Sequence, residues 1–282
     1  MNNILLQVAD FWLGPMDRIR LKLFRFLIGF ALLMYTGFRW VFADEWLTAS
    51  GFHVSAGNLP YFDFTVPLLT HNQLFWFGTV YFASIAAFMI GWQLRWSGIL
   101  TMLGLIYVSA ADQLSFFSPN KILLISLLIV TCAEWGGYAR RRGQSKRAPS
   151  AWPIRILQLT FIIHMFAAGW SKIFFGGEWL IRPFVFWTQV QGTYRTDFAA
   201  WLLNTLPVQG WVFLQWGALL FELLIPFLLF YKPLRRFGII WGLFFQLMIA
   251  ATMQHLIYFN LIMISFFVLF MDEDYLRSFL TV

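Results

Sequence analysis

Apolar residues recur in long runs along the chain, separated by shorter polar segments. Runs of nearly 20 apolar residues are typical of α-helices that cross the hydrocarbon core of a bilayer. The last run is short for a complete span, so we expect it to be tilted or to pack behind its neighbours. The pattern predicts an all-α integral membrane protein with about eight transmembrane helices, at residues 21–42, 74–94, 96–112, 120–138, 153–174, 210–231, 237–254 and 256–271.

The basic residues between the runs predict an orientation. If the N-terminus is cytoplasmic, five of the 20 Lys and Arg residues lie near or beyond the outer boundary, namely Arg39, Lys121, Lys172, Arg182 and Arg195. The other fifteen lie inside or at the inner boundary. This asymmetry follows the positive-inside rule. We therefore expect both termini to be cytoplasmic.

The segments that flank the runs predict the remaining organisation of a single transmembrane domain over residues 1–282. Residues 1–20 lack a small-residue cleavage site and are typical of a short interfacial amphipathic helix. Residues 139–152 form a basic cytoplasmic loop. Residues 43–73 and 175–209 are aromatic-rich outer loops, in which we expect interfacial helices.

Composition supports the membrane interpretation and excludes other classes of protein. The 282 residues are 60% hydrophobic and 12% charged, whereas soluble domains are about 25% charged. The net charge of +7 does not indicate nucleic-acid binding, because the basic residues follow the span boundaries. The single cysteine, Cys132, excludes an intrachain disulfide and a CxxC redox centre. His53, His71 and His255 show no ligand spacing, so no metal is expected.

Ionisable side chains within apolar runs are candidates for function, because each costs about 2.5–3.5 kcal/mol at the bilayer centre. Lys172 lies near the outer end of the fifth run. It either extends to the lipid headgroups or, desolvated among aromatic residues such as Trp170 and Trp179, acts as a general base. His164 either bonds to a neighbouring helix or lines a cavity with Lys172. Glu222, deep in the sixth run, must be protonated or paired, in a functional site or a structural bridge.

Three further polar residues belong to the last two runs. Gln246 lies in the middle of the seventh run, where a structural hydrogen bond to another helix is the favoured role. His255 and Asn260 lie at the break between the seventh and eighth runs. Irregular backbone at that depth needs surrounding protein or a water-filled cavity. These two residues could line such a cavity.

The segment "FAAGWSKIFFGGEW", residues 166–179, resembles the signature of the HTTM family, the transmembrane domain shared with vitamin K-dependent gamma-glutamyl carboxylase. Ala168, Gly169, Lys172 and Trp179 fit the family pattern. The opening "RLKLFRFLIGFALLMYTGFRW", the segment "FELLIPFLLFYKPLRRFG" and the ending "FFQLMIAATMQHLIYFNLIMISFFVLF" are similar in layout. The resemblance covers nearly the whole chain and implies a short bacterial member of the family.

The resemblance implies that Lys172 is the base that deprotonates a quinol such as vitamin K hydroquinone. It also implies a role for Asn120, which matches the first residue of an Asn-His pair in the family. Here Lys121 replaces that histidine, and Gln246 stands where the family commonly has another. The lumenal region that docks the carboxylase substrate is absent. These departures argue against glutamate carboxylation itself.

The sequence thus leads to one main hypothesis and two alternatives. The main one is a carboxylase-like enzyme of the bacterial cytoplasmic membrane, with an outward-facing aromatic pocket, a quinone or hydroquinone, and a secreted peptide as a further substrate. A non-catalytic membrane component for maturation or export of a peptide toxin is the first alternative. A proton-coupled transporter that uses Glu222 and His164 is the second. Membrane lipid is an expected partner in all three, and nucleic acid in none.

Overall fold

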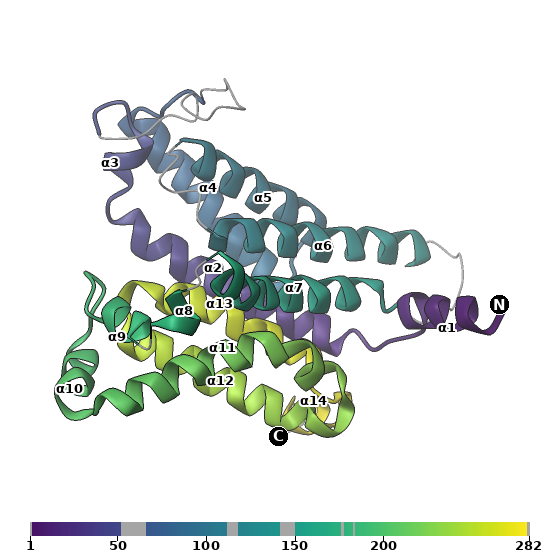
Figure 1. The fold of residues 1–282 in the computed structure, drawn as a ribbon. Helices are drawn as coiled ribbons and strands as arrows, with labels where there is room; N and C mark the ends of the chain where they lie inside the picture. The colour runs from purple at the N-terminus through teal and green to yellow at the C-terminus, as the bar shows by residue number, and fades with distance from the viewer. Residues whose placement is uncertain are drawn as a thin grey trace. The chain divides into compact units, whose positions relative to one another are not determined.

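The computed structural model describes residues 2–51, 66–111, 118–141, 150–175, 178–182 and 184–280. Every regular element within these ranges is a helix (Figure 1). The elements are α1 Asn2–Leu13, α2 Ile19–Trp40, α3 Ala43–Leu47, α4 His71–Ile90, α5 Leu94–Ala111, α6 Ser118–Arg141, α7 Trp152–Phe174, α8 Glu178–Ile181, α9 Val185–Val190, α10 Asp197–Thr205, α11 Val208–Phe230, η3 Lys232–Leu234, α12 Arg235–Thr252, η4 Gln254–Leu256, α13 Ile257–Phe267, η5 Val268–Phe270 and α14 Glu273–Leu280.

The chain folds into two compact units. Unit 1 comprises Met1–Leu157 and Glu273–Val282, and unit 2 comprises Gln158–Asp272. Helix α7 begins in unit 1 and continues into unit 2. Each unit has its own buried apolar residues, and the two are described separately below.

Unit 1 is built from α2, α4, α5 and α6, in which α5 packs against both α4 and α6, and α4 also packs against α2. A capping box starts α4: the Thr70 side chain accepts from the Gln73 backbone N–H, and the Gln73 side chain accepts from the Thr70 backbone N–H. Gly91 ends the same helix with a positive φ of 85°, a conformation that glycine adopts without steric cost. The tight reversal into α5 follows directly.

Unit 2 is organised along one face of α7. Gln158 donates a hydrogen bond of 2.8 Å to the Leu269 carbonyl oxygen, which ties the start of this face to the end of the chain's last apolar helix. One turn later, Phe161 packs against the rings of Phe266, Phe267 and Phe270. Helix α12 packs against both α11, which precedes it in the chain, and α13, which follows it. This face of α7 therefore contacts the core of unit 2 and positions the residues farther along the helix.

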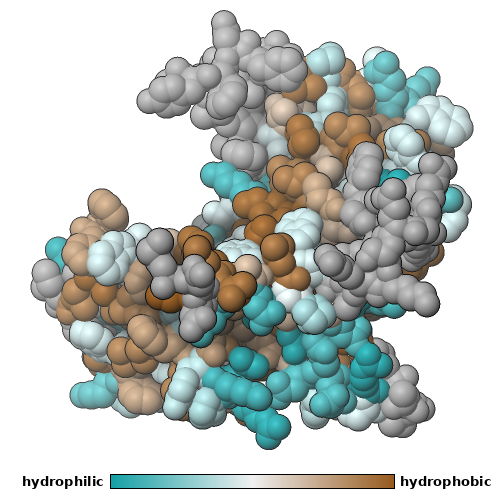
Figure 2. All heavy atoms as spheres, turned by 90° about the vertical axis from the view of Figure 1, so that its right-hand side faces the viewer, coloured by the Kyte–Doolittle hydropathy of each residue, from teal (hydrophilic) through white to brown (hydrophobic). Residues whose placement is uncertain are grey.

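Six helices in the described residues are long and apolar enough to span a membrane, namely Ile19–Trp40, His71–Ile90, Leu94–Ala111, Trp152–Phe174, Val208–Phe230 and Lys232–Thr252. The segments Ser118–Ala133 and Ile257–Phe270 are shorter apolar helices at the fourth and eighth predicted runs. Apolar side chains cover much of the surface seen in Figure 2. The all-α membrane fold is confirmed, whereas the number of eight spans and the cytoplasmic termini remain predictions.

The two aromatic-rich loops contain short helices in their described parts. Helix α3 lies in the first loop, and α8, α9 and α10 lie in the second. His53 and the rest of residues 52–65 lie outside the described residues, as do residues 142–149 of the basic loop. His71 is the first residue of α4, and its Nδ1 lies 3.0 Å from Asp44 Oδ1.

The C-terminal helix α14 is attached to the beginning of α2 by ion pairs within unit 1. Arg277 contacts Asp17, and Arg20 lies 3.5 Å from Glu273. Partial burial tends to raise the pKa of Asp17, but hydrogen bonds from the Ile19 backbone N–H and from Arg277 outweigh it and lower the pKa below the usual carboxyl value. The charged carboxylate therefore stabilises the attachment of α14.

Replacing Arg277 by Ala should loosen α14. Because these pairs are partly exposed, we expect a modest effect, with amide hydrogen exchange in residues 273–280 rising up to about fivefold. The pair should stabilise the attachment above the ordinary carboxyl pKa and lose its effect as the pH falls through the lowered value. Hydrogen exchange measured by mass spectrometry tests this, and unchanged protection of α14 in the variant would contradict it.

Candidate functional site

The central feature of unit 2 is a contact between Lys172 of α7 and Glu222 of α11. The lysine Nζ lies 2.5 Å from both carboxylate oxygens. The Glu222 side chain is 6% exposed and that of Lys172 is 23% exposed. Charge-assisted hydrogen bonds of this kind are short and strong. The two residues that the sequence analysis considered separately thus form one pair, and the carboxyl group has the cation that its burial demands.

Gly169 allows α7 to approach α11 closely enough for this contact. A Cβ atom added at Gly169 would lie 2.9 Å from the Glu222 Cβ and 3.3 Å from the Leu223 side chain. Met165, Gly169 and Lys172 follow at spacings of four and three residues, which place them on one face of the helix. The glycine of the Ala-Gly-x-x-Lys motif therefore provides the close approach, and the lysine one turn later provides the charge.

Pro226 lies one turn after Glu222 inside α11. Proline has no backbone N–H, so the Glu222 carbonyl oxygen lacks the helical hydrogen bond that a residue at this position normally donates. The helix nevertheless continues from Val208 to Phe230. The site therefore places both a charged side chain and a backbone oxygen without its helical partner at the same turn of α11.

Trp179 and Gln215 complete the surroundings of the lysine. The Lys172 Nζ lies 4.6 Å from the Trp179 ring centroid, a favourable cation–π distance. The buried Gln215 amide donates to the Trp179 and Arg182 carbonyl oxygens at 2.8 and 3.0 Å and accepts from the Phe186 backbone N–H at 3.0 Å. Gln215 thus fastens the segment from α8 to α9 onto α11.

Gln215 is not among the residues predicted from the sequence. A signal for it exists in the sequence, since Gln215 interrupts an apolar run seven residues before Glu222. Seven residues are two helical turns, so both side chains lie on one face of α11. Polar residues repeated at this spacing in an apolar helix indicate a shared buried contact.

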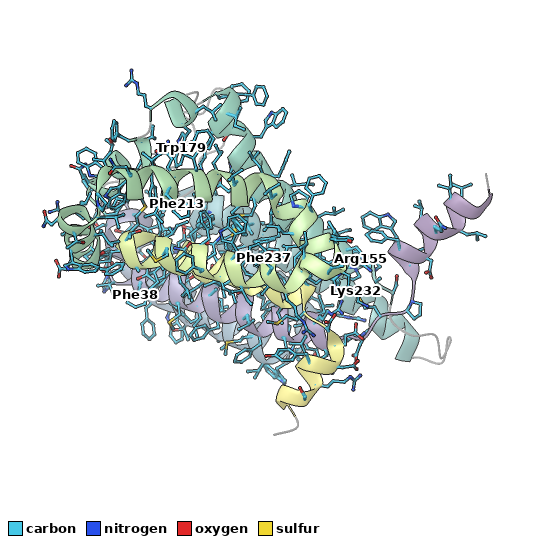
Figure 3. All side chains as sticks on the ribbon, turned by 60° about the horizontal axis from the view of Figure 1, so that its bottom comes forward. Phe38, Arg155, Trp179, Phe213, Lys232 and Phe237 are labelled. Carbon is cyan, nitrogen blue, oxygen red and sulfur yellow. The ribbon has the colours of Figure 1, made fainter. Side chains whose placement is uncertain are left out.

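An aromatic groove lies next to the pair along α11 and has a volume of about 220 Å³. Ala218 lines it and lies one turn before Glu222, about 6 Å along the helix axis. The Trp211 ring is buried, and its indole N–H has no hydrogen-bond partner among the described residues. Phe213 projects from α11 (Figure 3). Lys172 and Glu222 do not line the groove, whose residues are Phe186, Leu202, Trp211, Phe213, Leu214, Gly217, Ala218, Trp241, Phe244, Phe245, Met248, Ile249 and Thr252.

Gln246 and Asn260 face the same interior of unit 2, and each is 1% exposed. The Gln246 Nε2 lies 4.0 Å from Met165 Sδ on the inner face of α7. Asn260 lies two turns before Phe267, whose ring lies against Gly242, one turn before Gln246. Within the described part of the chain, neither polar atom of the Asn260 amide has a hydrogen-bond partner, nor does Gln246 Oε1. The structural hydrogen bond expected for Gln246 is thus a weak contact with sulfur.

The remaining candidates in unit 2 do not join the pair. The half-buried His164 ring lies 6.0 Å from the Phe259 ring. Trp170 is 46% exposed and lies 4.1 Å from the Phe174 ring, on another face of α7. His255 belongs to η4, and its side chain lies outside the described residues.

Asn120 and Lys121 belong to unit 1. Asn120 is fully buried: its Oδ1 accepts from the Tyr35 hydroxyl at 2.8 Å, and its Nδ2 donates to Ser109 at 2.8 Å. Arg39 in turn donates to the Tyr35 hydroxyl at 2.7 Å. Lys121 is exposed. These hydrogen bonds give Asn120 an evident structural role in joining α2, α5 and α6.

The part of the chain that the structure describes contains no group of three or more His, Cys, Asp or Glu side chains able to hold a metal ion. The chemistry that the described site offers is therefore that of an amine and a carboxylate in contact, flanked by an indole ring and an apolar groove.

Comparison with known proteins identifies the family. The family model described as HTTM domain matches residues 14–275, which is nearly the whole chain and includes both units. No curated protein matches the chain. No solved structure matches it either.

Replacing Gly169 by Ala should separate α7 from α11. The added methyl group would meet the Glu222 Cβ, so either helix must shift, and we expect a loss of about 1–3 kcal/mol in stability. Gly37→Ala is the matched control, because nothing lies within 4 Å of its added Cβ and alanine favours a helix. A lower thermal midpoint for Gly169→Ala alone, measured in detergent, supports the close approach. Equal midpoints would refute it.

The buried amides give a second prediction. Gln246→Met and Asn260→Leu replace unpartnered polar groups with apolar groups of similar size, so stability should stay constant or increase. Gln158→Met removes an amide bonded to the Leu269 carbonyl oxygen and should cost about 1–3 kcal/mol. Thermal unfolding of the three variants checks the contrast. A strong loss of stability in the first two would show that their amides have partners.

Proposed function

Because the chain belongs to the HTTM family, we propose that it is a carboxylase-like membrane enzyme in which Lys172 removes a proton from a lipophilic, quinol-type substrate. The observation that carries this proposal is the contact of the lysine amine with both oxygens of Glu222 inside an apolar helix pair. The family match supports a membrane protein related to vitamin K-dependent carboxylase, and the pair supplies a chemical reason for the lysine of the shared motif.

Glu222 gives the lysine a way to act as a base. A protonated amine cannot accept a proton, so Lys172 must first transfer one. The Glu222 carboxylate, at 2.5 Å, can accept it, and the resulting neutral amine and carboxylic acid carry the same total charge as the ion pair. A low dielectric lessens the preference for the ionic form. The neutral amine can then take the proton of a substrate hydroxyl, which leaves an oxyanion beside the new ammonium group.

The aromatic groove supports a lipophilic substrate. Its lining is almost wholly apolar and rich in aromatic rings, which suits a lipophilic ring system. A quinol bound there would supply the acidic hydroxyl, and this chain would supply the base. The last α11 residue that lines the groove, Ala218, lies one turn before Glu222. A bound ring therefore needs to reach only about 6 Å beyond the groove to approach the pair.

We extend the proposal to the setting of the reaction. The short helices α9 and α10 carry exposed aromatic side chains, including Trp187, Phe198 and Trp201. Such a surface suits an apolar segment of a secreted peptide, the further substrate or partner that we propose. The location that we propose is the bacterial cytoplasmic membrane, with this surface outside.

The proposal predicts the effects of three substitutions. In lipid nanodiscs with a naphthoquinol, Lys172→Ala should abolish quinol turnover. Lys172→Arg should abolish it as well, because guanidinium stays protonated. Glu222→Gln should reduce it at least about 100-fold, because an amide does not accept the proton. Lys232→Ala is the matched control, since this exposed lysine lies beyond the C-terminal end of α11, outside the helix that carries Glu222 (Figure 3).

Quinol consumption and products would be followed by absorbance and mass spectrometry. Turnover in the wild type and the control, with loss in all three variants, supports the enzyme. Full activity of Lys172→Arg would contradict a base and favour a non-catalytic scaffold for peptide maturation. Absence of quinol turnover in the wild type, combined with proton flux that Glu222→Gln abolishes, would favour the transporter.

A further inference from the structure

Helix α1 has a wide apolar surface. Gln7 and Asp10 are three residues apart and lie on one narrow side of the helix. From Ile4 to Leu13, all the other residues of the helix are apolar, namely Ile4, Leu5, Leu6, Val8, Ala9, Phe11, Trp12 and Leu13. No lysine or arginine occurs in the helix.

The apolar side chains of α1 are exposed in the structure. Ile4, Leu5 and Leu6 are 64–68% exposed, Leu13 is 65% exposed and Val8 is 50% exposed. The helix extends beyond the start of α2 (Figure 1). If this 12-residue helix of about three turns stood in water, a large apolar area would be uncovered, which soluble surfaces rarely show. Some apolar phase must therefore cover this helix.

The position of α1 identifies that phase. The helix ends at Leu13, and the membrane-spanning helix α2 begins at Ile19, so five residues connect them. Its end is also held to the start of α7, a second candidate span: the Ala151 backbone N–H donates to the Gly14 carbonyl oxygen at 3.0 Å. One end of α1 is thus fixed at the level where two helices enter the membrane.

Arg155 in the first turns of α7 strengthens this attachment. Its guanidinium lies 4.4 Å from the Phe11 ring centroid, and its Nε donates to the Phe11 carbonyl oxygen at 3.4 Å (Figure 3). The Ser150 hydroxyl donates to the Trp12 carbonyl oxygen, also at 3.4 Å. These contacts involve the C-terminal end of α1 and leave the apolar side chains of its first two turns uncovered.

We propose that α1 is a membrane-surface anchor that lies in the boundary between lipid headgroups and acyl chains. The apolar side, with Leu5 and Val8, faces the acyl chains, and the narrow side with Gln7 and Asp10 faces water. Because the helix has an acidic residue and no basic one, apolar burial drives its binding, and anionic headgroups are not required. The occupant of this surface is therefore the lipid itself.

Site-specific fluorescence tests the anchor. With Cys132 replaced by Ala, single cysteines at Leu5, Val8, Gln7 or Asp10 are labelled with an environment-sensitive fluorophore in the full chain. The proteins are reconstituted in phosphatidylcholine vesicles, with and without phosphatidylglycerol. Nitroxide groups on the acyl chains should quench labels at Leu5 and Val8 severalfold more than those at Gln7 and Asp10. Aqueous iodide should show the reverse order.

A label at Ile240, which is 67% exposed on the candidate span α12, is the control for contact with lipid. Equal access of iodide to both sides of α1 would overturn the anchor. Protection of the Leu5 and Val8 labels from both quenchers would also overturn it, because protein would then cover the surface. Lipid quenching that depends on phosphatidylglycerol would refute the apolar mode of binding.

Discussion

The placement of one carboxyl group within an apolar helix constrains much of unit 2. Glu222 is nearly inaccessible, and a buried carboxylate is tolerable only beside a compensating cation. Lys172 supplies this cation from α7, which requires α7 and α11 to approach each other closely. Gly169 permits the approach because it has no side chain to separate them. The Ala-Gly-x-x-Lys motif thus allows Glu222 to be buried as a charged group, and it also supplies the lysine proposed as the base.

The contacts made by the inner face of α7 differ along its length, because the face meets a different helix at each point. At its beginning, Gln158 and Phe161 contact the last apolar helix through a satisfied amide and a cluster of aromatic rings. In the middle, Met165 meets Gln246 in a weak contact. At its end, Lys172 meets Glu222. Satisfied packing at the start of α7 and a close ion pair at its end are consistent with a scaffold that holds the lysine in place.

Much of the fold could be predicted from the sequence, because apolar runs report directly on membrane helices. The lysine motif also identified one member of the pair. The pairing itself was not predicted, since counting residues along each helix placed Lys172 near the outer boundary and Glu222 deep in the bilayer. That arithmetic ignores helix tilt and the reach of a lysine side chain. For Asn120, the family resemblance implied a role but not its partners, and the structure shows hydrogen bonds that join three helices.

The segment that carries Trp179 gives the lysine a cover. Its indole ring lies over the amine, and Gln215 holds the backbone of the same segment through two carbonyl oxygens. Loss of the Gln215 hydrogen bonds would free this segment and uncover the amine. The position of the segment from α8 to α9 and the accessibility of the lysine nitrogen therefore both depend on the hydrogen bonds of one glutamine side chain.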